Sequence, residues 1–484
     1  MKSVRGPPLF HYTPVSRLLK SMALNIFPSE TPPLMREYIF HNVPKEYLRR
    51  RELVFDPNVQ IPPKGLAFSG DFESGNLGCV WKIAPRIYEI NLLPDPSRMY
   101  SATWFYFKVD NITPGEYSFI ISGFYRDAQL HNQGVQPVAL SMNNVRRGGG
   151  WERIGSRLNF WCSKTSRTAP EYSLAFSFNV IARDTMYFAY LYPYTYSDLR
   201  SFITSSKLNA TSICVSSGGI DVPAIFWDAD VRNFVRPINK IFVKKKNYNY
   251  KPLIVIAARL HPGESNSSYA MEGFMARLFD GSNNSKSLLN NFSFLLLPMM
   301  NPDGVICGYF RPQLTGTDMN RVWRRPDKRH IPEAASVVAL LDVLSQTRPI
   351  MFLLDFHGHT AQCNAFTYGV RDPRTRLNEY EPLFPRIVGK YTSLFDVNES
   401  ISFHSREYPT TMRVALHHRY NIPFAYTLEM SFGGLNIGER AGTQLTEDSY
   451  REVGIATVDA IGELLLVSAP IEEITSCYIP PQLF

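Results

Sequence analysis

Two different patterns of hydrophobic and polar residues divide the chain. Between about residues 61 and 197, short aromatic and β-branched runs such as 104–109 and 172–178 are separated by Gly, Asn, Asp and Pro. No helical repeat lies between these runs, and strands at that spacing are typical of an antiparallel sandwich or barrel. We therefore predict an all-β domain over residues 61–197.

From about residue 198 onward, buried strands alternate with helices, which is the pattern of a sheet covered by helices on both faces. The candidate central strands are 253–258, 292–297, 351–356 and 425–428. One helix is predicted to begin at Pro332, and a last one to run from Thr446 to about Val467. Residues 198–484 are thus predicted to be α/β, and residues 1–60, which are rich in Pro and Arg, to form an extended arm.

Composition narrows the choice of function. The 484 residues are 44% hydrophobic, enough for more than one core. The net charge of +8 favours an acidic partner such as nucleic acid, anionic lipid or a polyacidic peptide. The six cysteines form no C-x-x-C pair, which indicates thiols in a reducing compartment. No apolar run approaches the ~20 residues of a membrane span, so we expect a soluble, cytoplasmic protein.

Candidate metal ligands follow two of the predicted strands. The turn His261-Pro262-Gly263-Glu264 follows the first, and His357-Gly358-His359 follows the third. In α/β sheets, ligands bind beyond the carboxyl ends of the strands, and two histidines with one carboxylate make a zinc site with an open fourth position. Each segment alone is more often a plain surface turn, so only their combination points to a metal.

Further polar residues supply the other parts of a hydrolytic site. Asn320 and Arg321 can together hold a carboxylate, and Arg311 can polarise a carbonyl, although such arginines also fit a solvated basic loop. Glu429 ends a predicted strand of otherwise uncharged residues. It is either paired in the core or a general base for metal-bound water.

Five segments together resemble the motifs of the cytosolic carboxypeptidases, a branch of the zinc metallocarboxypeptidases that trims glutamates from tubulin. They are 261–264, 301–304, 318–321, 355–359 and 426–429. Upstream, segments 72–77, 104–107, 150–151 and 187–196 resemble the β-sandwich that precedes the catalytic domain in that branch. The resemblance implies a mixed sheet flanked by helices over residues 198–484, with an antiparallel β-sandwich before it.

The resemblance also implies roles for individual residues. His261, Glu264 and His357 would hold one zinc ion, with His359 outside its coordination. Glu429 would take a proton from the zinc-bound water and pass it to the leaving amine.

By the same resemblance, Asp318 would accept the other ring proton of His261. Arg311 would polarise the scissile carbonyl, while Asn320 and Arg321 would clasp the terminal carboxylate of the substrate.

Arg413 best matches the cationic residue that receives the terminal side chain in this branch. A buried guanidinium without a counter-charge is costly, so it would select a terminal Glu or Asp. The segment Glu407 to Thr411 departs from the family pattern, and Arg419 therefore remains a competitor.

We accordingly expect a zinc metallopeptidase that removes C-terminal or side-chain glutamates from acidic tails, tubulin above all, and that works as a cytoskeleton-associated monomer. Two alternatives stay open: a non-catalytic tubulin-binding module, and a same-fold amidohydrolase acting on small N-acyl amino acids. Serine-hydrolase, phosphate-loop and His-Glu-x-x-His motifs are absent from the sequence, and nucleic-acid binding would depend on net charge alone.

Overall fold

The computed structural model describes residues 51–62, 65–96, 102–125, 129–164, 170–228, 250–372 and 380–468. The predicted N-terminal arm lies almost wholly outside these ranges. Contacts within the chain define two compact units. The first comprises Met1–Asp198, Asp303–Thr317 and Thr360–Gln362, and the second comprises Leu199–Pro302, Asp318–His359 and Cys363–Phe484.

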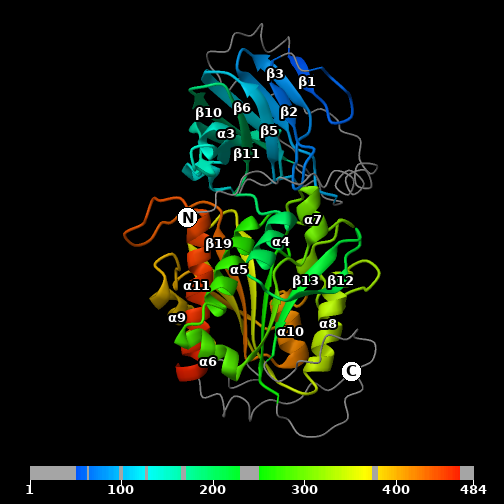
Figure 1. The fold of residues 1–484 in the computed structure, drawn as a ribbon, viewed down its shortest axis with the longest axis vertical. Coiled ribbons are helices and arrows are strands. Elements are labelled where there is room, and N and C mark those ends of the chain that lie inside the picture. The colour runs from blue at the N-terminus through cyan, green and yellow to red at the C-terminus, as the bar shows by residue number, and fades with distance from the viewer. Residues whose placement is uncertain are drawn as a thin grey trace. The chain divides into compact units, whose positions relative to one another are not determined.

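The first unit contains two sheets (Figure 1). In order across it, the six-stranded sheet contains β1 (Glu52–Phe55), β3 (Val80–Ala84), β4 (Ile87–Asn91), β6 (Gly115–Phe124), β10 (Glu171–Val180) and β9 (Ser156–Lys164). The five-stranded sheet contains β2 (Ala67–Ser69), β5 (Tyr106–Ile112), β11 (Asp184–Ala189), β7 (Val138–Ser141) and β8 (Glu152–Arg153). All pairings are antiparallel except that of β4 with β6.

Aromatic side chains fill the space between these two sheets. The ring of Phe188 on β11 lies 5.1 Å from that of Phe119 on β6 and 4.9 Å from that of Phe178 on β10. All three are buried, and each contributes about 1.5–3 kcal/mol on leaving water. The predicted all-β region is therefore two sheets packed face to face. Short helices η1 (Leu130–Gln133), α3 (Met142–Val145) and α7 (Pro302–Cys307) accompany them.

The second unit is built on one mixed sheet of eight strands. Their order is β12 (Ala210–Val215), β13 (Asp221–Trp227), β15 (Ser293–Leu297), β14 (Leu253–Ala258), β16 (Ile350–His359), β19 (Phe424–Ser431), β17 (Ala365–Arg371) and β18 (Ile401–His404). The four central strands are parallel, and every residue of β14 is buried, as continuous apolar runs predict. β16 and β19 continue beyond their predicted ends, because their pairing extends to His359 opposite Ser431.

Helices cover both faces of this sheet. They are α4 (Tyr196–Ser205), α5 (Ser265–Leu278), α6 (Asn283–Asn291), η3 (Met319–Arg321), α8 (Pro332–Leu344), α9 (Leu383–Tyr391), α10 (Met412–Tyr420), α11 (Glu447–Glu463) and the π-helical turn η5 (Leu464–Ser468). α8 and α10 share one core with β14 and β16, and Figure 1 shows α8 and α11 on opposite sides of the strands. α5 and α11 pack closely at Gly454, where a Cβ atom would lie only 1.9 Å from the Ala270 carbonyl oxygen.

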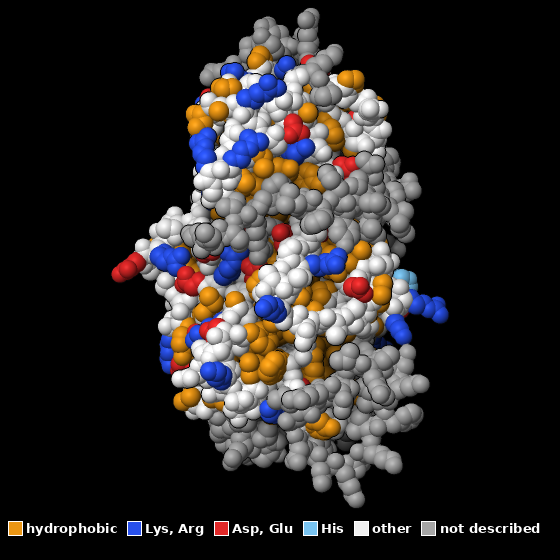
Figure 2. All heavy atoms as spheres, viewed as in Figure 1, with side chains coloured by type: hydrophobic (Ala, Val, Ile, Leu, Met, Phe, Trp, Pro, Cys, Tyr) orange, Lys and Arg blue, Asp and Glu red, His pale blue; other side chains and the backbone are white. Residues whose placement is uncertain are grey.

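Two observations, one on surface charge and one on helix hydrophobicity, bear on the expected partners. On the face drawn in Figure 2, Lys and Arg side chains are scattered among apolar and acidic groups rather than gathered into one basic patch. None of the helices within the described ranges is both long and apolar enough to cross a bilayer.

Candidate metal centre and catalytic site

A tight turn at the end of β14 presents His261 and Glu264. Arg259, which is buried and has a φ of 59°, donates from Nε and Nη2 to the Pro262 carbonyl at 3.0 and 2.6 Å. The side chain of Asn301 donates to the Leu260 carbonyl at 3.3 Å. Sequence reasoning assigned no role to Arg259 or Asn301, and both hold the backbone from which the candidate ligands project.

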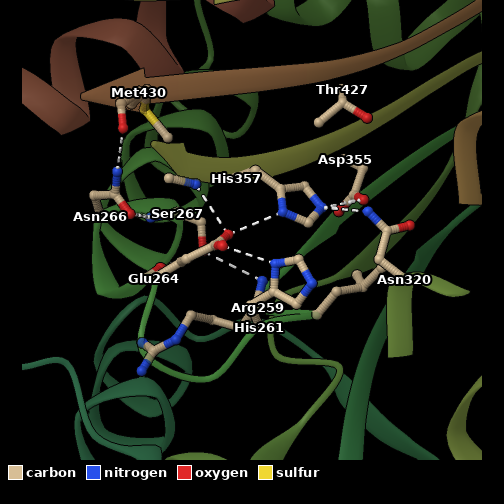
Figure 3. Close-up of polar contacts among 12 residues, drawn as sticks. Arg259, His261, Glu264, Asn266, Ser267, Asn320, Asp355, His357, Thr427 and Met430 are labelled. Carbon is tan, nitrogen blue, oxygen red and sulfur yellow. Dashed lines mark hydrogen bonds and ion pairs between the residues drawn. The ribbon is translucent and has the colours of Figure 1, made fainter. Parts of the chain in front are cut away.

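The three predicted ligands converge on one point, and all three are buried (Figure 3). Glu264 lies between the two imidazoles, with Oε1 2.7 Å from His261 Nδ1 and Oε2 2.9 Å from His357 Nδ1. The Gly358 amide donates to Oε2 at 3.0 Å. The ligand atoms lie within 4.8 Å of one another, and two imidazole nitrogens with one carboxylate suit a zinc ion with an open fourth position.

Each imidazole also contacts an aspartate through Nε2, the ring nitrogen that does not face Glu264. Asp318 Oδ1 lies 3.0 Å from His261 Nε2, and Asp355 Oδ2 lies 2.5 Å from His357 Nε2. Metal-binding histidines commonly have such partners, which fix the ring tautomer and orientation. The analysis of the sequence identified Asp318 and missed Asp355. The available signal was the strand repeat, because Asp355 and His357 are two residues apart and share a face of β16.

Electrostatics keep Glu264 ionised despite its burial. Desolvation alone would raise the pKa of this carboxyl, but contact with His261 and His357 outweighs it and lowers the pKa below its usual range. For His357, burial opposes protonation, but Asp355 and Glu264 together raise the pKa well above its usual value. Three carboxyl groups therefore surround the two imidazoles, an arrangement that suits a bound cation.

The strand register places Glu429 beside this cluster. Glu429 on β19 is paired directly with His357 on β16, so both side chains lie on the same face of the sheet. The surrounding protein reduces hydration of the Glu429 carboxyl and raises its pKa to about 7, while His357 acts in the opposite direction. The predicted strands ended before His357 and Glu429, whereas the observed strands β16 and β19 include these two residues.

The short helix η3 positions Asn320 and Arg321. Asp318 caps this helix by accepting a hydrogen bond from the Asn320 amide at 2.8 Å. The Asn320 side chain accepts from the Met412 amide at 2.9 Å, and its Nδ2 lies 3.4 Å from His357 Nε2. Arg321 is exposed and donates to its neighbour's carbonyl at 2.8 Å. Asn320 therefore joins the metal cluster to the start of α10.

The two candidate specificity arginines lie in different environments. Arg413 is only 4% exposed, donates to Thr427 Oγ1 at 3.1 Å, and has a buried Nε without a hydrogen-bond partner among the described residues. Burial lowers its pKa to about 10, although Glu429 and Asp355 favour the charged form. Arg419 is exposed and forms a two-pronged ion pair with Asp342 at 2.7 and 2.8 Å.

Comparisons with known proteins agree with this geometry. Residues 235–449 match the family described as zinc carboxypeptidase. The chain is 30% identical to cytosolic carboxypeptidase 3 of Mus musculus over 406 residues, and 30% identical to cytosolic carboxypeptidase 2 of Homo sapiens over 414 residues. Residues 235–449 thus form a zinc carboxypeptidase domain. Each alignment covers 82% of this chain but only 40% and 44% of the relative, so the chain spans less than half of their length.

Solved structures extend the comparison to the fold. A metallo-carboxypeptidase from Burkholderia cenocepacia superposes with a TM-score of 0.65 at 19% identity, covering 84% of this chain and 100% of that one. A metallo-carboxypeptidase from Pseudomonas aeruginosa gives a TM-score of 0.65 at 22% identity, over 82% and 99% of the two chains. The predicted metallocarboxypeptidase fold is confirmed.

Arg311 belongs to the first unit, unlike the other candidate residues of this zinc carboxypeptidase site. It lies after α7 in the segment 303–317, and its backbone amide donates to Asp95 Oδ2 at 3.2 Å. The Phe310 amide donates to the other oxygen of the same carboxylate at 2.9 Å. Asp95 thus fixes the backbone that carries Arg311, and the role of the Arg311 side chain stays a prediction.

We expect Asp355→Asn to weaken zinc binding by about 10- to 100-fold, because an amide orients His357 less firmly and makes its nitrogen less basic. Competition with a chromophoric chelator would measure the affinity. Asp396→Asn is a matched control, since that aspartate is buried in the same unit but does not contact either histidine. Equal affinity of wild type and Asp355→Asn would contradict the role given to Asp355.

Proposed function

We propose that the chain is a zinc-dependent carboxypeptidase that removes glutamate from acidic protein tails, including the tails of tubulin. The observation that carries this proposal is the convergence of His261, Glu264 and His357 beside Glu429, which is paired with His357 across the sheet. Zinc carboxypeptidase membership supports the reaction class. Arg413 and the positive net charge support the acidic substrate.

The metal would be held by the two Nδ1 atoms and the Glu264 carboxylate. Zinc bound there would activate a water molecule and polarise the scissile carbonyl. Glu429 would accept the proton of that water and deliver it to the leaving amine. A nearby divalent cation lowers the pKa of a carboxyl, so the base would be ionised at neutral pH.

The remaining residues would bind the end of the substrate. Asn320 and Arg321 would hold the terminal carboxylate, for which the exposed guanidinium of Arg321 is accessible. Arg413 would receive the terminal side chain, because its buried guanidinium has no partner for Nε within the described part of the chain and would be stabilised by a carboxylate. Arg311 would stabilise negative charge on the carbonyl oxygen, a role that follows from the family resemblance.

We also propose that residues 61–197 form a separate sandwich domain, that residues 198–484 form the catalytic domain, and that the protein is cytoplasmic, cytoskeleton-associated and monomeric. The boundary between the two compact units at Asp198 supports a division at that point, although residues 303–317 and 360–362 belong to the first unit. The names of the cytosolic carboxypeptidases support the location.

Release of free glutamate from a synthetic oligoglutamate tail would test the activity. We expect release by zinc-loaded protein, loss of release after chelator treatment, and recovery on adding zinc. A peptide of the same length ending in leucine is the matched substrate control. Absence of release by folded, zinc-loaded protein would contradict the glutamate assignment, and release from the leucine peptide alone would indicate a different terminal residue.

A further inference from the structure

A second cluster of metal-binding side chains lies at the C-terminal end of α10. Asp372 directly follows β17, and His417 and His418 lie on the last turn of α10. Their ligand atoms lie within 4.8 Å of one another. Asp372 and His417 are 2% and 6% exposed, while the His418 side chain is 30% exposed. The cluster is therefore mostly buried and reachable from solvent on one side.

Backbone carbonyls fix the tautomer of both imidazoles. His417 Nδ1 lies 2.8 Å from the Ile422 oxygen, and His418 Nε2 lies 2.6 Å from the Ser405 oxygen. A carbonyl oxygen only accepts, so these two nitrogens carry the protons. In a neutral imidazole the opposite nitrogen then holds a lone pair. This is the arrangement that metal-binding histidines commonly adopt.

The opposite nitrogens both face the Asp372 carboxylate. His417 Nε2 lies 3.3 Å and His418 Nδ1 lies 4.0 Å from Asp372 Oδ2. A direct charged hydrogen bond is shorter, about 2.7–2.9 Å. Tetrahedral zinc with ligands at 2.0–2.1 Å instead separates adjacent ligand atoms by about 3.3 Å. The 3.3 Å separation of His417 Nε2 from Asp372 Oδ2 equals this value, and His418 Nδ1 would have to approach the same oxygen by about 0.7 Å.

We propose that Asp372, His417 and His418 form a second zinc site. Two imidazoles and one carboxylate are ligands that zinc accepts, and the exposed side of His418 leaves room for water as a fourth ligand. The ion would fasten the end of α10 to the end of β17. Since α10 carries Arg413 at its other end, zinc here would stabilise the element that holds this side chain. The proposal does not depend on peptidase activity.

Zinc stoichiometry of the full chain tests this proposal. After chelator treatment and titration with Zn²⁺, we expect two equivalents in wild type, one in His418→Ala and one in His357→Asn. His330→Ala is the matched control and should keep two, because its side chain is 67% exposed and pairs with Asp327. Equal zinc uptake by wild type and His418→Ala would overturn the proposal.

The His357→Asn chain separates this proposal from the catalytic one. With Co²⁺ in place of zinc, this variant should retain a visible absorption band. The band should disappear in the double variant that also carries His418→Ala. Circular dichroism would verify that both variants are folded. Retention of one metal equivalent in His357→Asn supports the second site, and loss of all metal binding overturns it. If only the catalytic proposal fails, wild type binds one equivalent and His418→Ala binds none.

Discussion

Replacement of Glu429 with Gln is expected to lower kcat for glutamate release by about 10²–10⁴-fold, the usual contribution of a positioned general base. Glutamine keeps the size of the side chain and its place opposite His357, but it cannot accept the proton of the attacking water. Zinc content is expected to stay at the wild-type value, because Glu429 is not among the three converging ligands. Steady-state kinetics with metal analysis of the same sample would measure both quantities.

Glu463→Gln is the matched control for this variant. Glu463 lies at the end of α11 on the surface, where it pairs with Lys390 at 2.5 Å. Its replacement should leave kcat unchanged. A Glu429→Gln protein with normal kcat would exclude the proposed base, whereas one with lost zinc would indicate that Glu429 helps to hold the metal.

Replacement of Arg413 with Met is expected to lower kcat/KM for a terminal glutamate by on the order of 10²–10³-fold. Removing one partner of a buried, hydrogen-bonded charge pair costs about 2–5 kcal/mol, which accounts for a loss of this size. Methionine retains much of the apolar volume, so the pocket should accept terminal leucine better than wild type does. Paired assays with glutamate-ending and leucine-ending peptides would measure this change in preference.

Arg419→Met provides the control, because it removes the same charge from the same helix. Arg419 is exposed and bound to Asp342, so its loss should affect stability by at most about 1 kcal/mol and leave the substrate preference unchanged. Equal losses of glutamate release in the two variants would point to a general effect of net charge. A loss confined to Arg419→Met would reverse the assignment.

Only the tertiary structure shows that these two arginines differ in burial. Arg413 and Arg419 are six residues apart on one helix, and both follow the segment Glu407 to Thr411, which departs from the family pattern. Helix periodicity gives no rule for which of two arginines is buried. The packing of α10 on β16 and β19 buries the first and leaves the second beside Asp342.

The sequence by itself determined the locally encoded features. The continuous apolar run 253–258 predicted the observed bounds of β14. The proline at position 332 predicted the observed start of α8. The turn that carries His261 and Glu264 was also readable, because proline and glycine restrict the backbone locally. These features depend on residues that are neighbours in the chain.

Only the tertiary structure decided which distant residues meet. Parallel pairing of β16 with β19 sets Glu429 opposite His357, and the fold brings Asp372 to His417 from 45 residues away in the chain. In the sequence, Asp355 is one residue of a predicted buried strand. The structure shows that its carboxylate contacts His357 Nε2. Strand register and helix packing are set by the burial of whole apolar faces, so they follow from the complete fold and not from any single segment.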